Sequence, residues 1–450
     1  MSQTTSFRSV LLKINPVLCG VILTTLLFIP PLRLAEGIPA FEIVDFLLPV
    51  AGVIFIARWS EIQPKNLVYL LFFYAAFILL TMIINHRLSF VSDYFEIYKI
   101  FKFILLFCLF SFLNPATGHQ LIKVLFLGLV LINLLHYFNV FHINTFLEQF
   151  YFGNKNYVEF GLNSAGLPVS KRMLGLTANP NNNAIIFCIF AIIFMPKKKP
   201  ALQDLTFFGL AVIMLFLCQS RTLTFAFALV LCTYAMLNLK EYRRTVLILL
   251  VSGISILSAI LITDNTAGIG TPINMTMVRN YEKKHPNLRW DDDRKEFINP
   301  TIINPDGSHS DSYLGTISYD ELTEGTSMNG RYEIWKRLWL MIKQKPLFGH
   351  GPYKEFFYEN KLYGENEFIF TTWRYGFLGL TIYLSIWSML FIMALKNRRT
   401  AAGMNLILVI VLYSVASLTN LPFSSTTLNM LFAIMVGMFL AELRMNREQS

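Results

Sequence analysis

Arginines and carboxylates gather at a few places where the chain enters or leaves apolar segments. Arg221 occupies a very short connection, Gln219-Ser220-Arg221-Thr222, between two apolar runs. Glu365, Asn366 and Glu367 stand directly before another apolar run. A guanidinium group binds phosphate in a bidentate fashion, and a partly desolvated carboxylate can take a proton from a sugar hydroxyl. These residue types in these positions are therefore candidates for chemistry on a phosphate-bearing substrate.

Structural interpretations of the same residues stay open at this point. Arg221 could simply extend its charged end toward lipid headgroups. Asn366 or Glu367 could cap the first N–H groups of a helix, a role that can coexist with chemistry. Arg172 is a further basic residue beside the segment Asn179-Pro180-Asn181, which is itself a good helix-start signal. That signal explains the asparagines but not the arginine.

The segment 329–342 predicts an amphipathic helix. Ile334, Leu338 and Ile342 recur at a spacing of four residues and share one face, while charged residues take the other. Such a helix could lie on the outer surface of a membrane. Arg331 falls in its first turn, next to free backbone N–H groups, where a cation could complete an anion cradle or could simply be solvated.

Composition identifies the elements that must position these residues. The chain has 450 residues, of which 54% are hydrophobic and only 15% are charged, and its mean hydropathy is +0.51. Soluble domains carry about 25% charged residues, so the chain is predicted to be an all-α polytopic membrane protein. Apolar runs predict about twelve transmembrane helices near 14–32, 41–57, 66–85, 100–114, 121–141, 180–196, 204–219, 222–238, 245–263, 367–395, 404–419 and 427–443.

The distribution of Lys and Arg predicts the orientation and explains much of the net charge of +10, so no nucleic-acid partner is expected. With both termini cytoplasmic, inner loops hold fifteen of these residues and short outer loops hold seven. We expect three parts: helices one to nine in 1–263, a large outer loop with amphipathic helices in 264–366, and helices ten to twelve in 367–450. Aromatic residues in the large loop argue against disorder.

Several other functions are not favoured by the sequence. The acidic run Asp291-Asp292-Asp293 lacks the ligand spacing of a calcium loop, and no nucleotide-binding motif is present, so we expect neither metal nor cofactor. A transporter or flippase would need charged residues inside the spans and broken helices at mid-membrane. Lys102 and Lys123 lie near span interiors, but we expect both to reach the ends of their spans.

Taken together, these motifs resemble the O-antigen polymerase and ligase superfamily of bacterial membranes. The resemblance covers about 170–440 and rests on the order of several short motifs and on the predicted topology. The motifs are Asn179-Pro180-Asn181, Ser220-Arg221-Thr222, Gly330-Arg331 with Trp335, Pro346 with Gly349 and Gly351, and Tyr375-Gly376-Phe377-Leu378-Gly379-Leu380. Ligases of the family usually carry His-Asn before the tenth span. Here Glu365-Asn366 stands there, which favours a polymerase over a ligase.

The resemblance implies a glycosyltransferase C-type fold in the bacterial cytoplasmic membrane that acts on undecaprenyl-pyrophosphate glycans at the periplasmic face. We expect Arg221 and Arg331, helped by Arg172, to hold the pyrophosphate of the donor and to stabilise its growing charge. Glu365, or failing that Glu367, would accept the proton of the attacking hydroxyl, and Asn366 and Tyr332 would bind substrate. The expected partners are this glycan substrate, the bilayer and a chain-length regulator protein. A ligase that transfers glycan to lipid A core and a non-enzymatic transporter are the alternatives.

Overall fold

The computed structural model describes residues 2–29, 42–138, 140–143, 173, 175–177, 179–196, 202–238, 242–263, 289–291, 296–298, 328–353 and 365–449. Within these ranges almost the whole chain is helical. Residues 264–288, 292–295, 299–327 and 354–364 of the expected large loop lie outside the described part, so the division into three parts stays a prediction.

Each of the twelve predicted apolar segments contains a helix. The helices are α1 (Ser2–Phe28), α2 (Ile43–Ala57), α3 (Lys65–Ile84), α4 (Val91–Ser111), α5 (Pro115–Phe138), α8 (Pro180–Ile193), α9 (Leu202–Leu217), α10 (Arg221–Leu237), α11 (Tyr242–Thr263), α16 (Glu367–Lys396), α17 (Ala401–Ala416) and α18 (Thr426–Gln449). Four of them, α3, α5, α16 and α18, are long and apolar enough to cross a membrane, and seven shorter apolar helices accompany them. The chain is therefore a polytopic helical protein, while twelve crossings remain a prediction.

The remaining described elements are few. The helix predicted over 329–342 is α14 (Met328–Gln344). Two short strands of the large loop, β1 (Arg289–Asp291) and β2 (Glu296–Ile298), pair antiparallel. Three short 3₁₀ turns, Trp59–Glu61, Val140–His142 and Gly175–Thr177, adjoin the helices.

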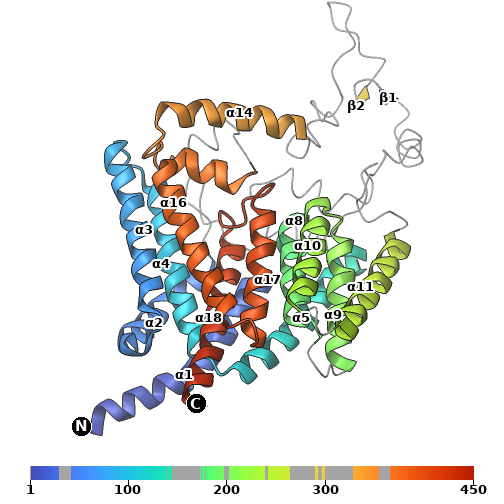
Figure 1. Ribbon diagram of the computed structural model, residues 1–450, viewed down its shortest axis with the longest axis horizontal. Coiled ribbons are helices and arrows are strands. Elements are labelled where there is room, and N and C mark those ends of the chain that lie inside the picture. The colour runs from blue at the N-terminus through green and yellow to red at the C-terminus, as the bar shows by residue number, and fades with distance from the viewer. Residues whose placement is uncertain are drawn as a thin grey trace, which may run out of the picture.

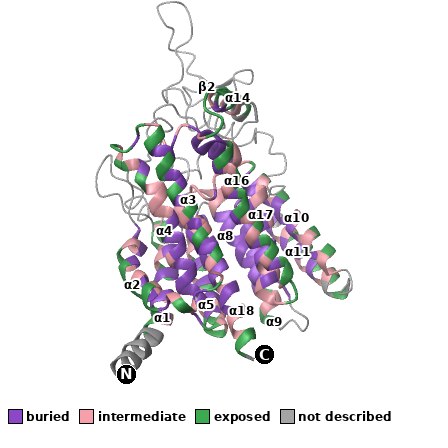
Figure 2. Cartoon of the chain, turned by 60° about the vertical axis from the view of Figure 1, so that its left-hand side comes forward, coloured by how far each residue is buried: buried purple, intermediate pink, exposed green. Residues whose placement is uncertain are grey.

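The apolar helices run side by side in one bundle (Figure 1). α18 packs along α4, α16 packs against α3 and α17, and α9 lies between α8 and α11. Buried residues fill the middle of the bundle, and exposed residues mark its periphery (Figure 2). In a bilayer such a periphery faces hydrocarbon, so exposed leucines and phenylalanines there are expected.

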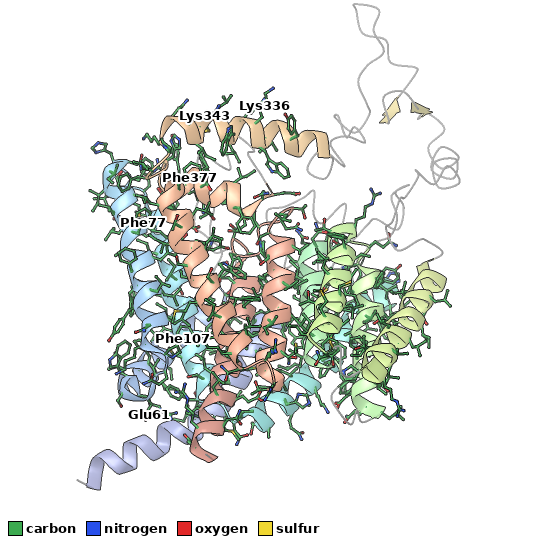
Figure 3. All side chains as sticks on the ribbon, viewed as in Figure 1. Glu61, Phe77, Phe107, Lys336, Lys343 and Phe377 are labelled. Carbon is green, nitrogen blue, oxygen red and sulfur yellow. The ribbon has the colours of Figure 1, made fainter. Side chains whose placement is uncertain are left out.

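α14 lies across one end of the bundle, and both chain ends lie at the opposite end (Figure 1). Lys336 and Lys343 project from α14 away from the bundle, whereas Phe377 lies beneath it on α16 (Figure 3). We call the end that carries α14 the outer end, following the predicted orientation. The structure thus separates the two termini from the residues that the sequence singles out for chemistry.

The expectation for Lys102 is wrong. This residue does not reach a helix end: its side chain is 2% exposed, and its Nζ lies 2.7 Å from Glu42 Oε2 and 2.6 Å from Asp45 Oδ1. Both carboxylates belong to the start of α2, which the ammonium thereby joins to α4. Tyr98 also donates to Asp45, at 2.7 Å. Leaving any one of these groups buried without its partner would cost several kcal/mol, about 3–5 in comparable cases.

Candidate functional site

A break in α16 positions the outer part of this helix. Gly376 has φ 64° and ψ −174°, a conformation that is available essentially only to glycine. Residues 367–375, which we call the half-helix, therefore leave the bundle at an angle to the rest of α16 (Figure 1). The half-helix begins at Asn366, whose side chain accepts hydrogen bonds from the N–H groups of Phe368 and Ile369. The expected cap is thus confirmed, and Asn366 rather than Glu367 provides it.

The turn at 345–351 replaces the helical hydrogen bonds that the break removes. A continuous helix would join the N–H groups of residues 377 and 378 to the carbonyls of residues 373 and 374. The turn provides two carbonyl acceptors for those N–H groups and two N–H donors for those carbonyls, so these four backbone groups each have a partner. The bonds are Phe377 N to Pro346 O (2.8 Å), Leu378 N to Leu347 O (3.3 Å), His350 N to Trp373 O (3.1 Å) and Gly351 N to Arg374 O (2.8 Å).

Glycine is required on both sides of this junction. A Cβ atom on Gly376 would overlap the backbone of Leu347, and one on Gly349 would overlap the backbone of Arg374. Both glycines also have positive φ. The two glycine-containing motifs noted in the sequence therefore form one interlocked junction.

α14 covers the outer side of the half-helix. Leu338 and Ile342, predicted to share the apolar face of α14, are buried against Phe370 and Trp373. His350 joins the same group, because its Nε2 lies 2.9 Å from the carbonyl oxygen of Met341 at the end of α14. Burial lowers the pKa of His350, which favours the neutral ring. The apolar face of α14 thus packs on the protein, whereas a membrane-surface location for this helix stays a prediction.

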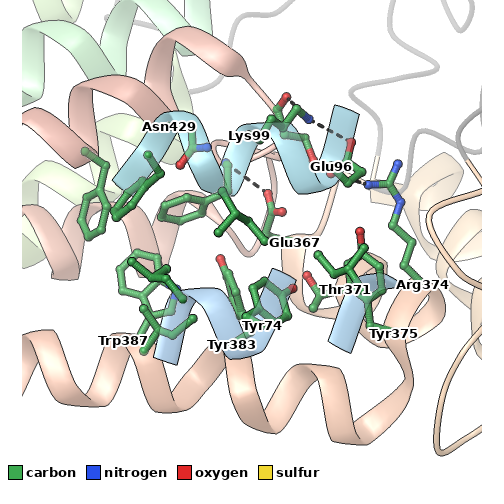
Figure 4. Close-up of a pocket in the computed structure, with 18 of the residues that line it drawn as sticks. Tyr74, Glu96, Lys99, Glu367, Thr371, Arg374, Tyr375, Tyr383, Trp387 and Asn429 are labelled. Atoms are coloured by element: carbon green, nitrogen blue, oxygen red, sulfur yellow. Dashed lines mark hydrogen bonds and ion pairs between the residues drawn. The ribbon is translucent and has the colours of Figure 1, made fainter. Parts of the chain in front are cut away.

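A pocket opens beneath the half-helix, between α3, α4, α16 and the start of α18 (Figure 4). It holds about 770 Å³ of empty space, a volume that includes the open solvent at its mouth. Its lining combines aromatic and aliphatic side chains with polar ones. The polar lining residues are Tyr74, Glu96, Lys99, Glu367, Thr371, Arg374, Tyr375, Tyr383, Ser424 and Asn429.

Glu96 on α4 binds both cations of the pocket. Its Oε1 lies 3.0 Å from Lys99 Nζ, and its Oε2 lies 3.1 Å from the Nη1 atom of Arg374 (Figure 4). Lys99 also donates to the carbonyl oxygen of Ser424, at 3.2 Å. All three charged side chains are at most 14% exposed, so each needs its ion-pair partners to compensate for the hydration it has lost. The pair with Arg374 joins the half-helix to α4.

Glu367 is the other carboxylate of the pocket and differs from Glu96 in its partners. It is 5% exposed, and its Oε2 accepts a hydrogen bond from the N–H of Phe423, at 3.3 Å. Among the described residues, no Lys, Arg or His forms an ion pair with it. The side chain points into the pocket beside Thr371 and Tyr383 (Figure 4). A buried carboxylate that is open to a pocket and makes no direct ion pair among the described residues is suited to accepting a proton.

The loop between α17 and α18, residues 417–425, connects this pocket to the turn that holds Arg221. On the pocket side, the backbone N–H of Glu367 donates a hydrogen bond to the carbonyl oxygen of Ser417. The side-chain amide of Asn366 donates a hydrogen bond to the carbonyl oxygen of Leu418. On the other side, Thr419 and Asn420 bond to α10 and α8. These bonds are Thr419 Oγ1 to Thr222 Oγ1 (3.1 Å) and Asn181 Nδ2 to Asn420 Oδ1 (3.2 Å), and Ser220 Oγ donates to Asn181 (2.7 Å).

Four of the predicted site residues, Glu367, Asn366, Arg221 and Glu365, belong to α10 or to the start of α16 and the residues before it. Glu367 lines the pocket, and Asn366 caps the half-helix at its edge. Arg221 is the exposed first residue of α10, in the turn bonded to the 417–425 loop. Glu365, with φ 39°, precedes the cap and is not among the residues that line the pocket.

The other predicted residues belong to the large loop or precede α8. Tyr332 is 62% exposed on α14 and does not line the pocket. Arg331 is placed in the first turn of α14, as expected, but its side chain lies outside the described part, as does the whole of Arg172. Asn179 caps α8 with its side chain, which confirms the helix-start signal.

Arg374 and Glu96 are not identified as site residues from the sequence. Lys99 is counted there only among the Lys and Arg residues of the short outer loops. A usable signal was present in the spacing. Glu367, Thr371 and Arg374 follow one another at four and three residues and share a helix face, as Glu96 and Lys99 do. Charges at such spacing inside an apolar stretch indicate buried pairs rather than a helix end.

Comparison with known proteins finds one family match within the chain. Residues 206–384, from α9 into α16, match the family described as O-antigen ligase. This match covers less than half of the chain and supports the resemblance of its motifs to the O-antigen polymerase and ligase superfamily. No curated protein matches the chain. Apolar helices and family together indicate a bacterial membrane protein of the glycosyl-transfer type. Among the described residues, no group of His, Cys, Asp or Glu is arranged to hold a metal.

Proposed function

We propose that the protein polymerises undecaprenyl-pyrophosphate-linked oligosaccharide repeat units at the periplasmic face of the bacterial cytoplasmic membrane. The observation that carries the proposal is the geometry of Glu367. This carboxylate opens into a pocket at the predicted membrane edge, without an ion-pair partner among the described residues. Because Glu365 does not line the pocket, Glu367 takes the role of the base.

In the proposed reaction a hydroxyl of the acceptor sugar attacks C1 of the donor sugar. The bond from C1 to the pyrophosphate oxygen breaks, and a new bond forms from C1 to the acceptor oxygen. The hydroxyl proton passes to Glu367, and undecaprenyl pyrophosphate leaves with the electron pair of the broken bond. A single displacement inverts the configuration at C1.

The arginines act on the leaving group. Arg221 and Arg331, with Arg172, stabilise the negative charge that grows on the pyrophosphate as the bond to C1 lengthens. Arg221 is exposed at the start of α10, where a headgroup phosphate can reach it. The 417–425 loop contacts both the Arg221 turn and the half-helix, so it supports the juxtaposition of donor phosphate and base that this mechanism needs.

Sizing of reaction products tests the proposal. Purified protein in nanodiscs is incubated with native undecaprenyl-pyrophosphate repeat units and no other acceptor, and the glycan is then sized by mass. We expect a ladder of multiples of one unit. Unchanged single units, with transfer only when lipid A core is added, would establish a ligase instead.

The ligase is the second candidate because the matching family is described as O-antigen ligase. Its chemistry at Glu367 and the arginines would be the same, and only the acceptor would differ. Absence of transfer to every acceptor, under conditions where the donor binds, would contradict both candidates and favour a transporter.

A further inference from the structure

The charges that line the pocket cancel. Among the described residues that line the pocket, four are charged: Glu96 and Glu367 are acidic, and Lys99 and Arg374 are basic. In the state in which Glu367 can accept a proton, the formal net charge of the lining is therefore zero. A lining with a formal net charge of zero supplies no net charge to offset that of an entering ion, and an ion loses more hydration on entry than a neutral molecule does.

Glu96 forms ion pairs with both cations of the pocket. Its two oxygens take Lys99 and Arg374 separately, at 3.0 and 3.1 Å, so both cations already hold a carboxylate. Glu96 is itself only 11% exposed. If a ligand displaced its carboxylate from the two cations, little water would be available to hydrate that carboxylate. A second carboxylate entering the pocket would have to compete with Glu96 for these cations. It would also come close to Glu367, which carries the same charge.

The groups that remain for a ligand suit a polyol. Glu367 and Asn429 offer oxygen acceptors, and Thr371 and Tyr383 offer hydroxyl groups that donate or accept. Trp387, also in the lining, contributes an aromatic surface that can contact the apolar face of a sugar ring. Hydrogen-bonding groups together with an aromatic surface provide both kinds of contact that a neutral sugar makes.

We propose that this pocket is the subsite of the accepting sugar, that this sugar is neutral, and that Glu96 sets the specificity by occupying Arg374 and Lys99. The inference rests on the proposed transfer to a sugar hydroxyl, and it holds for a polymerase and for a ligase alike. It states a property of the acceptor that neither the family nor the fold specifies: a hexose or N-acetylhexosamine is accepted, whereas a uronic acid is rejected.

Linkage analysis of natural material provides the first test. Methylation analysis of the single unit and of the polymer, or of the core before and after ligation, identifies the sugar that carries the accepting hydroxyl. We expect this sugar to be neutral. If it is a uronic acid or carries a phosphate or pyruvate group, the inference is overturned, although glycosyl transfer itself would stand.

Enzyme variants provide the second test. The acceptor is supplied in two forms that differ only at C6 of the accepting sugar, which is either the alcohol or its oxidation product, the carboxylate. Wild-type protein should extend the alcohol at least about tenfold faster, because a charged group that loses its hydration needs a free partner. In the variant Glu96→Gln the two cations lose this carboxylate, so this ratio should fall by about tenfold or reverse.

A double variant separates specificity from damage to the fold. Glu96→Gln with Lys99→Gln leaves Arg374 and Glu367, so the formal net charge returns to zero and preference for the alcohol should return with it. Glu61→Gln removes an acidic partner of Arg58 near the inner end and should leave the ratio unchanged. Equal rates with both acceptors in the wild type would overturn the inference, whereas no transfer with either would contradict the proposed function instead.

Discussion

At the scale of single residues, the two glutamates before α16 have different surroundings. Glu367 lines the pocket, and Glu365 stands beyond the cap that Asn366 provides. The sequence placed both at the membrane edge but offered no means of choosing, because a change of two positions around a helix start reverses the direction of a side chain.

Replacement of each glutamate by glutamine tests this choice. Glu367→Gln keeps the size of the side chain but removes the proton acceptor, so the rate of chain extension should fall roughly 10²–10⁴-fold. Glu365→Gln should stay within about threefold of the wild type, since a base that does not contact the acceptor contributes little. Rates are measured from product ladders at saturating donor. The reverse order of effects would assign the base to Glu365.

The predicted phosphate ligands allow a separate prediction. Arg221→Ala and Arg331→Ala should each abolish chain extension, because each removes a cation from the developing charge of the leaving group. Membrane expression should stay normal, since both residues stand at the first turn of a helix rather than in the buried core. Extension is followed in cells by sizing of surface glycan. Wild-type ladders in both variants would exclude this mechanism.

At the scale of elements, the break in α16 at Gly376 positions the residues at the outer end. The 345–351 turn satisfies the four backbone groups at the break, and α14 covers the half-helix from outside. Together these contacts fix the direction in which Glu367 and Arg374 point. The half-helix is thus positioned by backbone bonds as well as by side chains.

Alanine at the junction should therefore disrupt the protein. Gly376→Ala and Gly349→Ala would each bring a Cβ atom into the backbone of the opposite segment and strain a positive φ, a cost of at least about 1–3 kcal/mol. We expect a lower melting temperature and loss of chain extension in both. Gly253→Ala on α11 is the matched control, because its Cβ would meet nothing within 4 Å. A Gly376→Ala protein as stable as this control would refute the role of the junction.

Helix positions could be predicted from the sequence far better than this junction. Each apolar segment contains a helix because apolar periodicity and length are local properties. The pairing of Arg374 with Glu96, and of Lys102 with α2, joins residues far apart in the chain, and no local pattern specifies such partners. The start of α4 shows the same limit: charged residues delayed the predicted start to 100, whereas the helix begins at Val91 because those charges are paired inside the bundle.

At the scale of the whole molecule, the bundle has two unlike ends. The outer end carries α14, the pocket and the Arg221 turn, and the inner end carries both termini (Figure 1). The Lys and Arg distribution predicts that the outer end faces the periplasm.

Cysteine labelling tests this orientation. In a chain whose five cysteines have been replaced, Lys343→Cys on α14 should react with a membrane-impermeant maleimide in spheroplasts. Glu448→Cys near the end of α18, where the side chain is 68% exposed, should react only after the membrane is permeabilised. Labelling is measured by mass shift on a gel. Reaction of Glu448→Cys in intact spheroplasts would invert the topology.

The 417–425 loop also has a consequence for biosynthesis. Glu367 receives a hydrogen bond from Phe423, which is 56 residues further along the chain. A ribosome therefore completes the half-helix well before it produces the loop that holds the carboxylate in place. During this interval Glu367 lacks this hydrogen bond, and the neighbouring Asn366 has no carbonyl of Leu418 to which it can donate. Under the proposed mechanism, a nascent chain that already contains Arg221 and Arg331 is therefore expected to stay inactive until its last two apolar helices have been inserted.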